Sequence, residues 1–217
     1  MTRRSLSKKA ITRMQQDAML ATKKAYQRLH RKTLQQDVCV AGMQRAGTNM
    51  LLDAFAPAKA LWLVRDYNDA VSSALVSFTN FAVQLGRIVE YRPAPCWRGR
   101  NMPDTTYALV RSLYTPDMND ATAAALIWYL RNVLFFEQQF ERDERVLLAH
   151  YENLVTQPQL EFPRIFDFLG LRYTPFVSSQ VFASSIHRRE PPVIAAPVRE
   201  LCDALSARFR ALAICSG

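Results

Sequence analysis

A glycine-containing loop, Gly42–Asn49, carries the first residues of this sequence that could do chemistry. It follows the apolar run Asp37–Ala41, which is typical of a short buried strand, and precedes a helical pattern from Thr48 to about Phe55. Glycines let the backbone turn so that successive N–H groups face an anion, and the N-terminus of the next helix adds a favourable dipole. The loop therefore predicts a site for a phosphate or a similar anion.

A second group of polar residues follows the apolar run Lys59–Val64, which also has the pattern of a buried strand. Arg65 comes directly after this run, and Asp69 and Ser73 follow at intervals of four residues in a helical pattern that begins near Asn68. An arginine at the carboxyl end of a strand and a hydroxyl from the next helix can converge on one phosphate. Arg65 and Ser73 are therefore predicted to form a second anion site.

The glycine-containing loop lacks two groups that nucleoside triphosphatases use. The phosphate loop of those enzymes has the pattern G-x-x-x-x-G-K-S/T, in which the lysine contacts the phosphates and the hydroxyl binds magnesium. Thr48 stands at the lysine position here, and Asn49 stands at the hydroxyl position. The sequence therefore predicts anion binding without a metal, and a nucleotide kinase with a degenerate loop remains an alternative.

Several segments taken together resemble the sulfotransferases that use 3′-phosphoadenylyl sulfate (PAPS). These enzymes have a 5′-phosphosulfate loop of the type K/R-S-G-T-T, a 3′-phosphate motif R-x-x-x-D-x-x-x-S, and a later Y-E-D-L segment followed by F-L-G at the end of a helix. The matching segments in this chain are Arg45–Asn49, Arg65–Ser73, Tyr151–Leu154 and Phe168–Gly170, in the same order. The joint match is more specific than any one of the segments.

The resemblance implies a role for each matched residue. Arg45 would neutralise charge on the bridging oxygen during transfer, and it is the one catalytic residue that the resemblance implies. Loop amides would hold the 5′-phosphosulfate, Arg65 and Ser73 would hold the 3′-phosphate, and Tyr151 would approach the adenine. A late basic segment, His187–Arg189, is similar to one that closes on the 3′-phosphate. The residues expected to bind the nucleotide are Arg45, Ala46, Gly47, Thr48, Asn49, Arg65, Ser73, Tyr151, Arg188 and Arg189.

The sequence departs from the family pattern in three places. Met50 stands where cytosolic members have a tryptophan, and Ala46 replaces the serine of the loop. Phe55 is followed almost at once by Lys59, where family members have many tens of residues, including much of the acceptor pocket and usually the catalytic His or Glu. Parallel crossovers normally take about a dozen residues or more, which indicates an unusually tight crossover or a segment absent from this sequence. The sequence identifies no general base.

Short apolar strands that alternate with helices predict an α/β fold with a P-loop-like parallel sheet covered by helices on both faces, as in sulfotransferases. Arg145–Ala149 has the pattern of a third strand. Further helices are expected over Ala121–Phe140, Phe162–Leu169 and about Pro197–Leu212. In the second of these, Pro163 suits the first turn and Gly170 suits the C-cap. Residues 86–104 are expected to form an irregular loop because they are rich in Pro and Arg.

The net charge of +9 belongs entirely to residues 1–32, which hold ten Lys and Arg against one acid, Asp17. Apolar residues recur there at helical spacing, which predicts a basic amphipathic N-terminal helix, and we assign residues 33–217 to a separate α/β domain. The helix is expected to contact its own domain, an anionic partner or a membrane surface. The rest of the chain is electrically neutral, so no specific nucleic acid binding is expected.

The expected location is cytoplasmic. No apolar run reaches the length of about 18 residues that a membrane span needs, and no apolar stretch follows the basic start as it does in a secretory signal. The four cysteines form no C-x-x-C pair and are expected to be reduced thiols.

The function predicted from the sequence is transfer of a sulfuryl group from PAPS to a hydroxyl or amine of a small-molecule or glycan acceptor. The nucleotide product would be 3′-phosphoadenosine 5′-phosphate (PAP), and no metal site is expected. A non-catalytic nucleotide-binding protein of the same fold is the other alternative.

Overall fold

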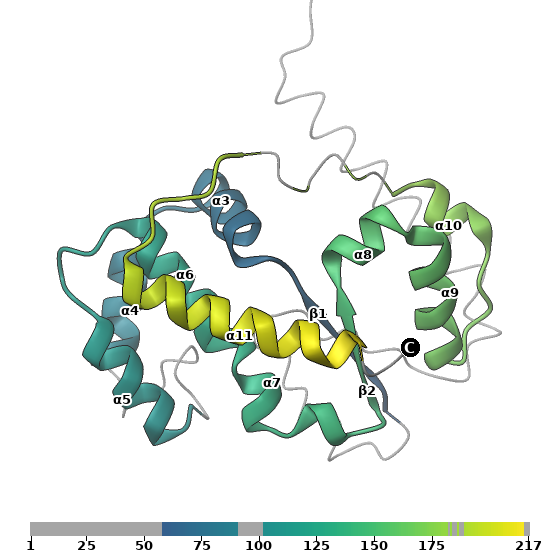
Figure 1. Ribbon diagram of the computed structural model, residues 1–217, viewed down its shortest axis with the longest axis horizontal. Helices are drawn as coiled ribbons and strands as arrows, with labels where there is room; N and C mark the ends of the chain where they lie inside the picture. The colour runs from purple at the N-terminus through teal and green to yellow at the C-terminus, as the bar shows by residue number, and fades with distance from the viewer. Residues whose placement is uncertain (1–57, 91–101, 182, 184–185, 187–188, 215–217) are drawn as a thin grey trace, which may run out of the picture. The chain divides into compact units, whose positions relative to one another are not determined.

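The computed structural model describes residues 58–90, 102–181, 183, 186 and 189–214 (Figure 1). Three predicted features lie outside these residues: the basic helix 1–32, the strand Asp37–Ala41 and the glycine-containing loop Gly42–Asn49. The boundary between residues 32 and 33 and the short junction after Phe55 also lie outside them.

Two short strands, β1 (Ala60–Val64) and β2 (Val146–His150), pair in parallel in the described part of the chain. The register places Ala60 opposite Val146 and Val64 opposite His150. Both strands are almost continuously apolar, as expected for strands that are buried on both faces. Each lies within one residue of the strand predicted from the sequence, so both predictions are confirmed.

Side chains of the two strands alternate between two apolar clusters, because successive residues of a strand point to opposite faces. Trp62 and its neighbours two residues away belong to the larger cluster. Leu61 and Leu63 belong to the smaller cluster, whose buried members are Ala149, Leu154, Ile165 and Leu169. Helices lie on both sides of the strand pair in Figure 1. The described chain is therefore mostly helical around a small parallel sheet, which is an α/β arrangement in the coarse sense.

Helices make up most of the described residues. Their bounds are α3 (Tyr67–Ser77), α4 (Phe81–Glu90), α5 (Asp104–Leu113), α6 (Asp120–Asn132), α7 (Leu134–Glu137), the 3-10 helix η1 (Phe140–Arg142), α8 (Tyr151–Thr156), α9 (Pro158–Phe168), α10 (Pro175–Ser179) and α11 (Ala196–Ile214). Helix α6 is apolar on nearly all sides and lies in the larger core, where it contacts α3, α4, α5, α7 and α11. Asn119 begins it, because the side-chain oxygen accepts the Thr122 N–H at 2.7 Å.

The prediction of one helix over Ala121–Phe140 was wrong. Helix α6 ends at Asn132, whose side-chain amide donates to the Trp128 carbonyl one turn earlier. The chain then continues as the short helices α7 and η1. Gln139 separates these two helices because its φ of 56° is left-handed and cannot continue a right-handed helix.

The expected loop over residues 86–104 was wrong at both ends. Helix α4 continues to Glu90 because Phe81, Leu85 and Ile88 form one buried stripe at helical spacing. Gly86 lies within it, and a Cβ there would approach the Tyr114 hydroxyl to 2.6 Å, so the glycine allows close packing. At the other end α5 begins at Asp104, and residues 91–101 lie outside the described part.

Helix α9 begins four residues earlier than predicted. Pro158 occupies its first turn, and Pro163 lies inside the helix rather than at its start. The predicted C-terminal glycine is confirmed: Gly170 has a φ of 68°, its N–H donates to the Asp167 carbonyl, and the Leu171 N–H donates to the Phe166 carbonyl. This pair of bonds is a Schellman motif, which needs the left-handed residue that glycine supplies.

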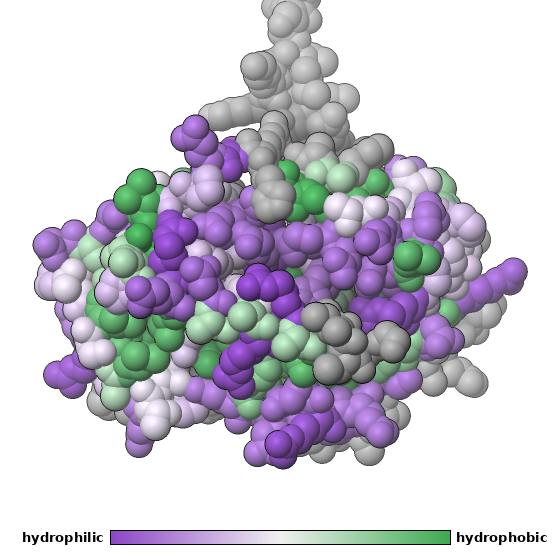
Figure 2. Space-filling model, in the orientation of Figure 1, coloured by the Kyte–Doolittle hydropathy of each residue, from purple (hydrophilic) through white to green (hydrophobic). Residues whose placement is uncertain are grey.

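None of the helices in the described part of the chain is long and apolar enough to cross a membrane. On the face drawn in Figure 2, hydrophilic residues predominate and apolar ones form separate small groups. The large apolar side chains with the highest exposure are Val76, Phe78, Val83, Leu160, Phe176 and Val193.

Candidate functional site

The carboxyl ends of β1 and β2 bring two of the predicted site residues together. Arg65 follows β1 and Tyr151 follows β2, and the parallel register places the two junctions side by side. The Arg65 guanidinium lies over the Tyr151 ring, 4.6 Å from its centroid, as in a cation–π contact. The Asp66 N–H donates to Glu152 Oε1 at 2.9 Å. Two segments that are far apart in the sequence are therefore joined at the carboxyl ends of the two strands.

Helix α3 starts immediately beyond this junction. Asp66 is its N-cap, and Oδ1 of that residue accepts the N–H groups of Asn68 at 2.9 Å and Asp69 at 3.2 Å. Such a cap satisfies backbone donors that have no partner within the helix. The position of the first turn of α3 is thereby fixed relative to Arg65.

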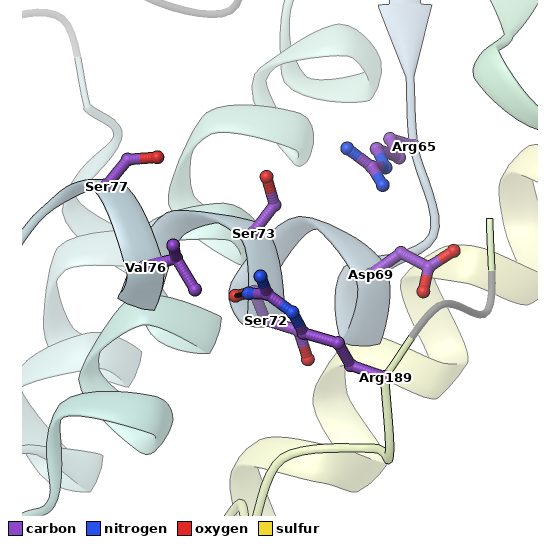
Figure 3. Close-up of a pocket in the computed structure, with 7 residues that line it drawn as sticks. All are labelled: Arg65, Asp69, Ser72, Ser73, Val76, Ser77 and Arg189. Carbon is purple, nitrogen blue, oxygen red and sulfur yellow. Dashed lines mark hydrogen bonds between the residues drawn. The ribbon is translucent and has the colours of Figure 1, made fainter. Parts of the chain in front are cut away.

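A pocket lies along one face of α3, beside the junction (Figure 3). The helical repeat places residues three, four and seven positions after Asp69 on the same face as it. The residues that line the pocket are Arg65, Asp69, Ser72, Ser73, Val76, Ser77 and Arg189. Arg65 and Ser73, which the sequence placed in one anion site, and Arg189, which the resemblance added to it, are therefore neighbours in the fold.

The pocket combines two guanidinium groups with the hydroxyls of α3. In Figure 3 the Arg65 side chain extends toward Ser73, and the Arg189 side chain lies along α3 beside Ser72. Arg189 Nη1 donates to the Ser72 carbonyl at 2.9 Å. Arginine keeps its charge at any pH a protein meets, and its planar fork suits phosphate and sulfate oxygens. Two such groups beside exposed serines favour binding of a phosphate-like anion.

Asp69 is the one carboxylate among the residues that line this pocket, and its side chain is buried. It belongs to the matched motif between Arg65 and Ser73. With two guanidinium groups and one carboxylate, the lining keeps a net positive charge, which an anionic group can neutralise.

The first turn of α3 and the Arg65 backbone are also held from the larger core. Trp128 Nε1 donates to the Arg65 carbonyl at 3.1 Å. The Tyr67 ring packs against the Trp128 ring at 5.7 Å between centroids. The Tyr67 hydroxyl donates to Asp203 Oδ1 at 2.7 Å, and burial together with that carboxylate raises the pKa of Tyr67. The neutral phenol therefore remains a hydrogen-bond donor at neutral pH.

His150 is the only histidine among the described residues, and it ends β2 next to Tyr151. Burial lowers the pKa of its imidazole below the usual value of 6.5, although Glu152 and Glu161 oppose this shift. The side chain is therefore mostly neutral at neutral pH. It does not line the pocket.

Several residues of the predicted site lie outside the described part of the chain. They are Arg45, Ala46, Gly47, Thr48, Asn49 and Arg188. The residues brought together are Arg65, Ser73, Tyr151 and Arg189, which form the part assigned to the 3′-phosphate and the adenine side.

Sequence reasoning missed some residues of the pocket and its support. Ser72, Val76 and Ser77 line it, and their spacing of three or four residues from Asp69 or Ser73 on a predicted helix was a usable signal. The bond from Trp128 to the Arg65 carbonyl had no sequence signal, because it joins residues 63 positions apart.

Comparison with known protein families, curated proteins and solved structures finds no match for this chain. Among the described residues no group of three or more His, Cys, Asp or Glu side chains could hold a metal ion. The pocket and the sequence segments that meet there are therefore the features of the molecule that bear on its function.

Proposed function

We propose that this protein is a PAPS-dependent sulfotransferase, which transfers a sulfuryl group to a hydroxyl or amine of a small-molecule or glycan acceptor. One observation carries the proposal: Arg65, Ser73 and Arg189 line a single pocket, and Tyr151 contacts Arg65. These residues come from three separate parts of the sequence, which were grouped because they resemble nucleotide-binding segments of one enzyme family. Their meeting at one place supports that grouping.

The position of the pocket supports a nucleotide as the ligand. Ligands of parallel α/β sheets bind outside the carboxyl ends of the strands, and the pocket lies at the carboxyl end of β1. In our proposal Arg65, Ser73 and Arg189 hold the 3′-phosphate, and Tyr151 lies on the adenine side. The cationic lining fits a phosphate monoester, whose charge is close to −2 at neutral pH.

The proposed reaction forms a bond between the acceptor oxygen or nitrogen and sulfur and breaks the bond between sulfur and the bridging oxygen of PAPS. The acceptor loses a proton, and PAP leaves. Transfer of this kind depends on positioning and on stabilisation of charge at the leaving oxygen, which we assign to Arg45 and the backbone amides of Arg45–Asn49. It needs neither a metal nor a γ-phosphate pocket, and this agrees with Thr48 at the position of the triphosphatase lysine.

Calorimetry with PAP tests the proposal. The purified protein should bind PAP in the presence of a chelator, and saturating PAP should raise the melting temperature by mass action. Absence of binding contradicts the proposal, and binding of ATP or PAP only with magnesium points to a nucleotide kinase.

A turnover assay separates an enzyme from a non-catalytic binder. The protein is incubated with PAPS and a panel of phenols, alcohols, amines and glycans, and the release of PAP is measured for each acceptor. PAP release that depends on an acceptor is expected. Tight PAP binding without turnover on any acceptor supports the non-catalytic alternative.

A further inference from the structure

The segment Arg189–Ala195, just before α11, runs from α3, which Arg189 contacts, to the start of α6, and it is held to the domain near its C-terminal end. The Ala195 N–H donates to Thr122 Oγ1 at 3.0 Å, and Asn119 Nδ2 donates to the Val193 carbonyl at 3.3 Å. Ile194 is buried in the larger core. These contacts fix one end of the segment, while Arg189 at the other end lies in the pocket.

Arg199, in the first turn of α11, joins this segment to the first turn of α3. Its Nη2 donates to the Pro192 carbonyl at 3.0 Å. Its Nη1 donates to the Tyr67 hydroxyl at 3.3 Å and lies 3.5 Å from Asn68 Oδ1. The Tyr67 hydroxyl gives its own proton to Asp203, so it is oriented to accept from Arg199. One guanidinium therefore spans two structural parts, as its forked geometry allows.

The chain between Arg189 and Pro192, whose carbonyl accepts a hydrogen bond from Arg199, is stiff. Only Glu190 and Pro191 separate Arg189 from Pro192. Proline fixes its own φ near −65° and restricts the residue before it to extended conformations, so Glu190 and both prolines have little freedom. A displacement of the Pro192 carbonyl is therefore transmitted to Arg189, whose side chain reaches the Ser72 carbonyl on α3.

We infer that Arg199 is a positioning residue of the anion pocket: it holds the Pro192 carbonyl against the first turn of α3 and so sets where Arg189 lies. Arg199 itself does not line the pocket. Its effect on ligands passes through Arg189 and is confined to the group that Arg189 contacts. The role in ligand binding rests on the proposed function, because the group expected there is the 3′-phosphate.

The test compares Arg199→Met with Arg210→Met, a matched change at an exposed position of the same helix. Affinities are measured by calorimetry for PAP and for adenosine 5′-phosphosulfate, which lacks the 3′-phosphate. Arg199→Met should weaken PAP binding about tenfold, the scale of one charge-assisted hydrogen bond, and should leave the 5′-phosphosulfate affinity unchanged. Arg210→Met should change neither affinity. Arg199→Lys keeps the charge without the fork, and its PAP affinity should lie between those of the wild type and Arg199→Met.

A double-mutant cycle with Arg189→Ala shows whether Arg199 acts on PAP binding through Arg189. If Arg199 acts through Arg189, the double variant binds PAP no more weakly than Arg189→Ala alone. Losses that multiply in the double variant overturn the inference. An equal loss for both ligands, accompanied by a lower melting temperature, also overturns it, because that pattern indicates a purely structural role.

Hydrogen exchange gives a reading that does not depend on any ligand. Arg199→Met should speed the exchange of the Ala195 amide, which donates to Thr122 Oγ1, and leave the amides of α6 unchanged. Unchanged exchange at Ala195 overturns the inference whatever the nucleotide data show. If the wild-type protein binds no PAP, the proposed function and the ligand-binding part of the inference fail, and the exchange data alone decide whether Arg199 anchors the segment.

Discussion

The two strands of the sheet end side by side, yet the chain leaves them in different ways. After β1 it passes through Arg65 and Asp66 into α3, and the Asp66 side chain caps that helix. After β2 it enters α8 directly, and His150 at the N-cap makes no side-chain cap hydrogen bond. The first junction carries pocket residues, whereas the second contributes supporting side chains.

The difference indicates where the protein fixes its geometry. The β1 junction is held from three directions, through the Trp128 indole, the Asp66 cap and the Glu152 carboxylate. The β2 junction supplies Glu152 and also Tyr151, which lies against Arg65. Anion binding gains from groups that are already in place before the ligand arrives, since less ordering is then needed on binding. We therefore infer that Tyr151 and Glu152 of the β2 junction hold Arg65 and Asp66 of the β1 junction in position.

The largest effect is expected from removing the pocket cation of the β1 junction. Arg65→Ala should weaken PAP binding by about 2–3 kcal/mol, the scale of charge-assisted bonds to a phosphate. Calorimetry measures this loss, with Arg111→Ala, at an exposed position of α5, as the matched control. Adenosine 5′-phosphosulfate should keep its affinity, and an equal loss for both ligands would show that Arg65 acts on the fold rather than on the 3′-phosphate.

A smaller effect is expected from removing the Glu152 carboxylate of the β2 junction. Glu152→Ala leaves the part-buried Asp66 N–H without its carboxylate acceptor, which should lower the free energy of unfolding by about 1–2 kcal/mol. Urea denaturation measures the change. Glu152→Gln keeps an acceptor oxygen and should lose less. If the two variants are equally unstable, the carboxylate serves some purpose other than accepting this bond.

The helix cap at the β1 junction should be worth about 1 kcal/mol. Asp66→Ala removes the acceptor of the Asn68 and Asp69 N–H groups, and urea denaturation should show this loss of stability. Asp66→Asn retains a capping oxygen and is the matched control. A full loss in the asparagine variant would argue that the charge of Asp66 matters more than its hydrogen bonds.

The smallest effect is expected at the β2 junction and depends on pH. Burial lowers the pKa of His150, so between that lowered value and 6.5 the unfolded chain binds more protons than the folded one. Stability contributed by the neutral imidazole is present above pH 6.5 and is lost as the pH falls below it. His150→Gln should therefore lose less stability than the wild type between about pH 7.5 and about pH 5.5 in denaturation experiments. Identical losses in both proteins would rule out this role.

The parts of the fold predicted from the sequence are those with a strong local signal. Lys59–Val64 and Arg145–Ala149 were predicted as strands because each is an apolar run with polar residues beyond it, and both strands formed. Gly170 was predicted as a helix end because glycine tolerates a positive φ, and the structure confirms it. The break at Gln139, where φ is 56°, gave no such signal, since glutamine is a good helix former.

The candidate site was predictable to a similar extent. Arg65 and Ser73 could be grouped from strand and helix positions alone, because the end of a strand and the next helix are close in any parallel sheet. Arg189 was grouped with them through the resemblance only. The contacts that hold these residues, such as those of the Arg199 guanidinium with the Tyr67 hydroxyl and the Pro192 carbonyl, depend on where α11 lies in the fold and could not be predicted from local patterns.

Long-range contacts around the pocket limit when it can form during synthesis of the chain. The bond between Asp66 and Glu152 joins residues 86 positions apart, and the bond from Arg189 to Ser72 joins residues 117 positions apart. Contacts of such long range slow folding, because a large loop must close before they form. On the ribosome these two bonds cannot form until Glu152 and Arg189 have been synthesised. A ligand that needs the complete pocket can therefore bind only the finished domain, and it cannot assist the early nascent chain to fold.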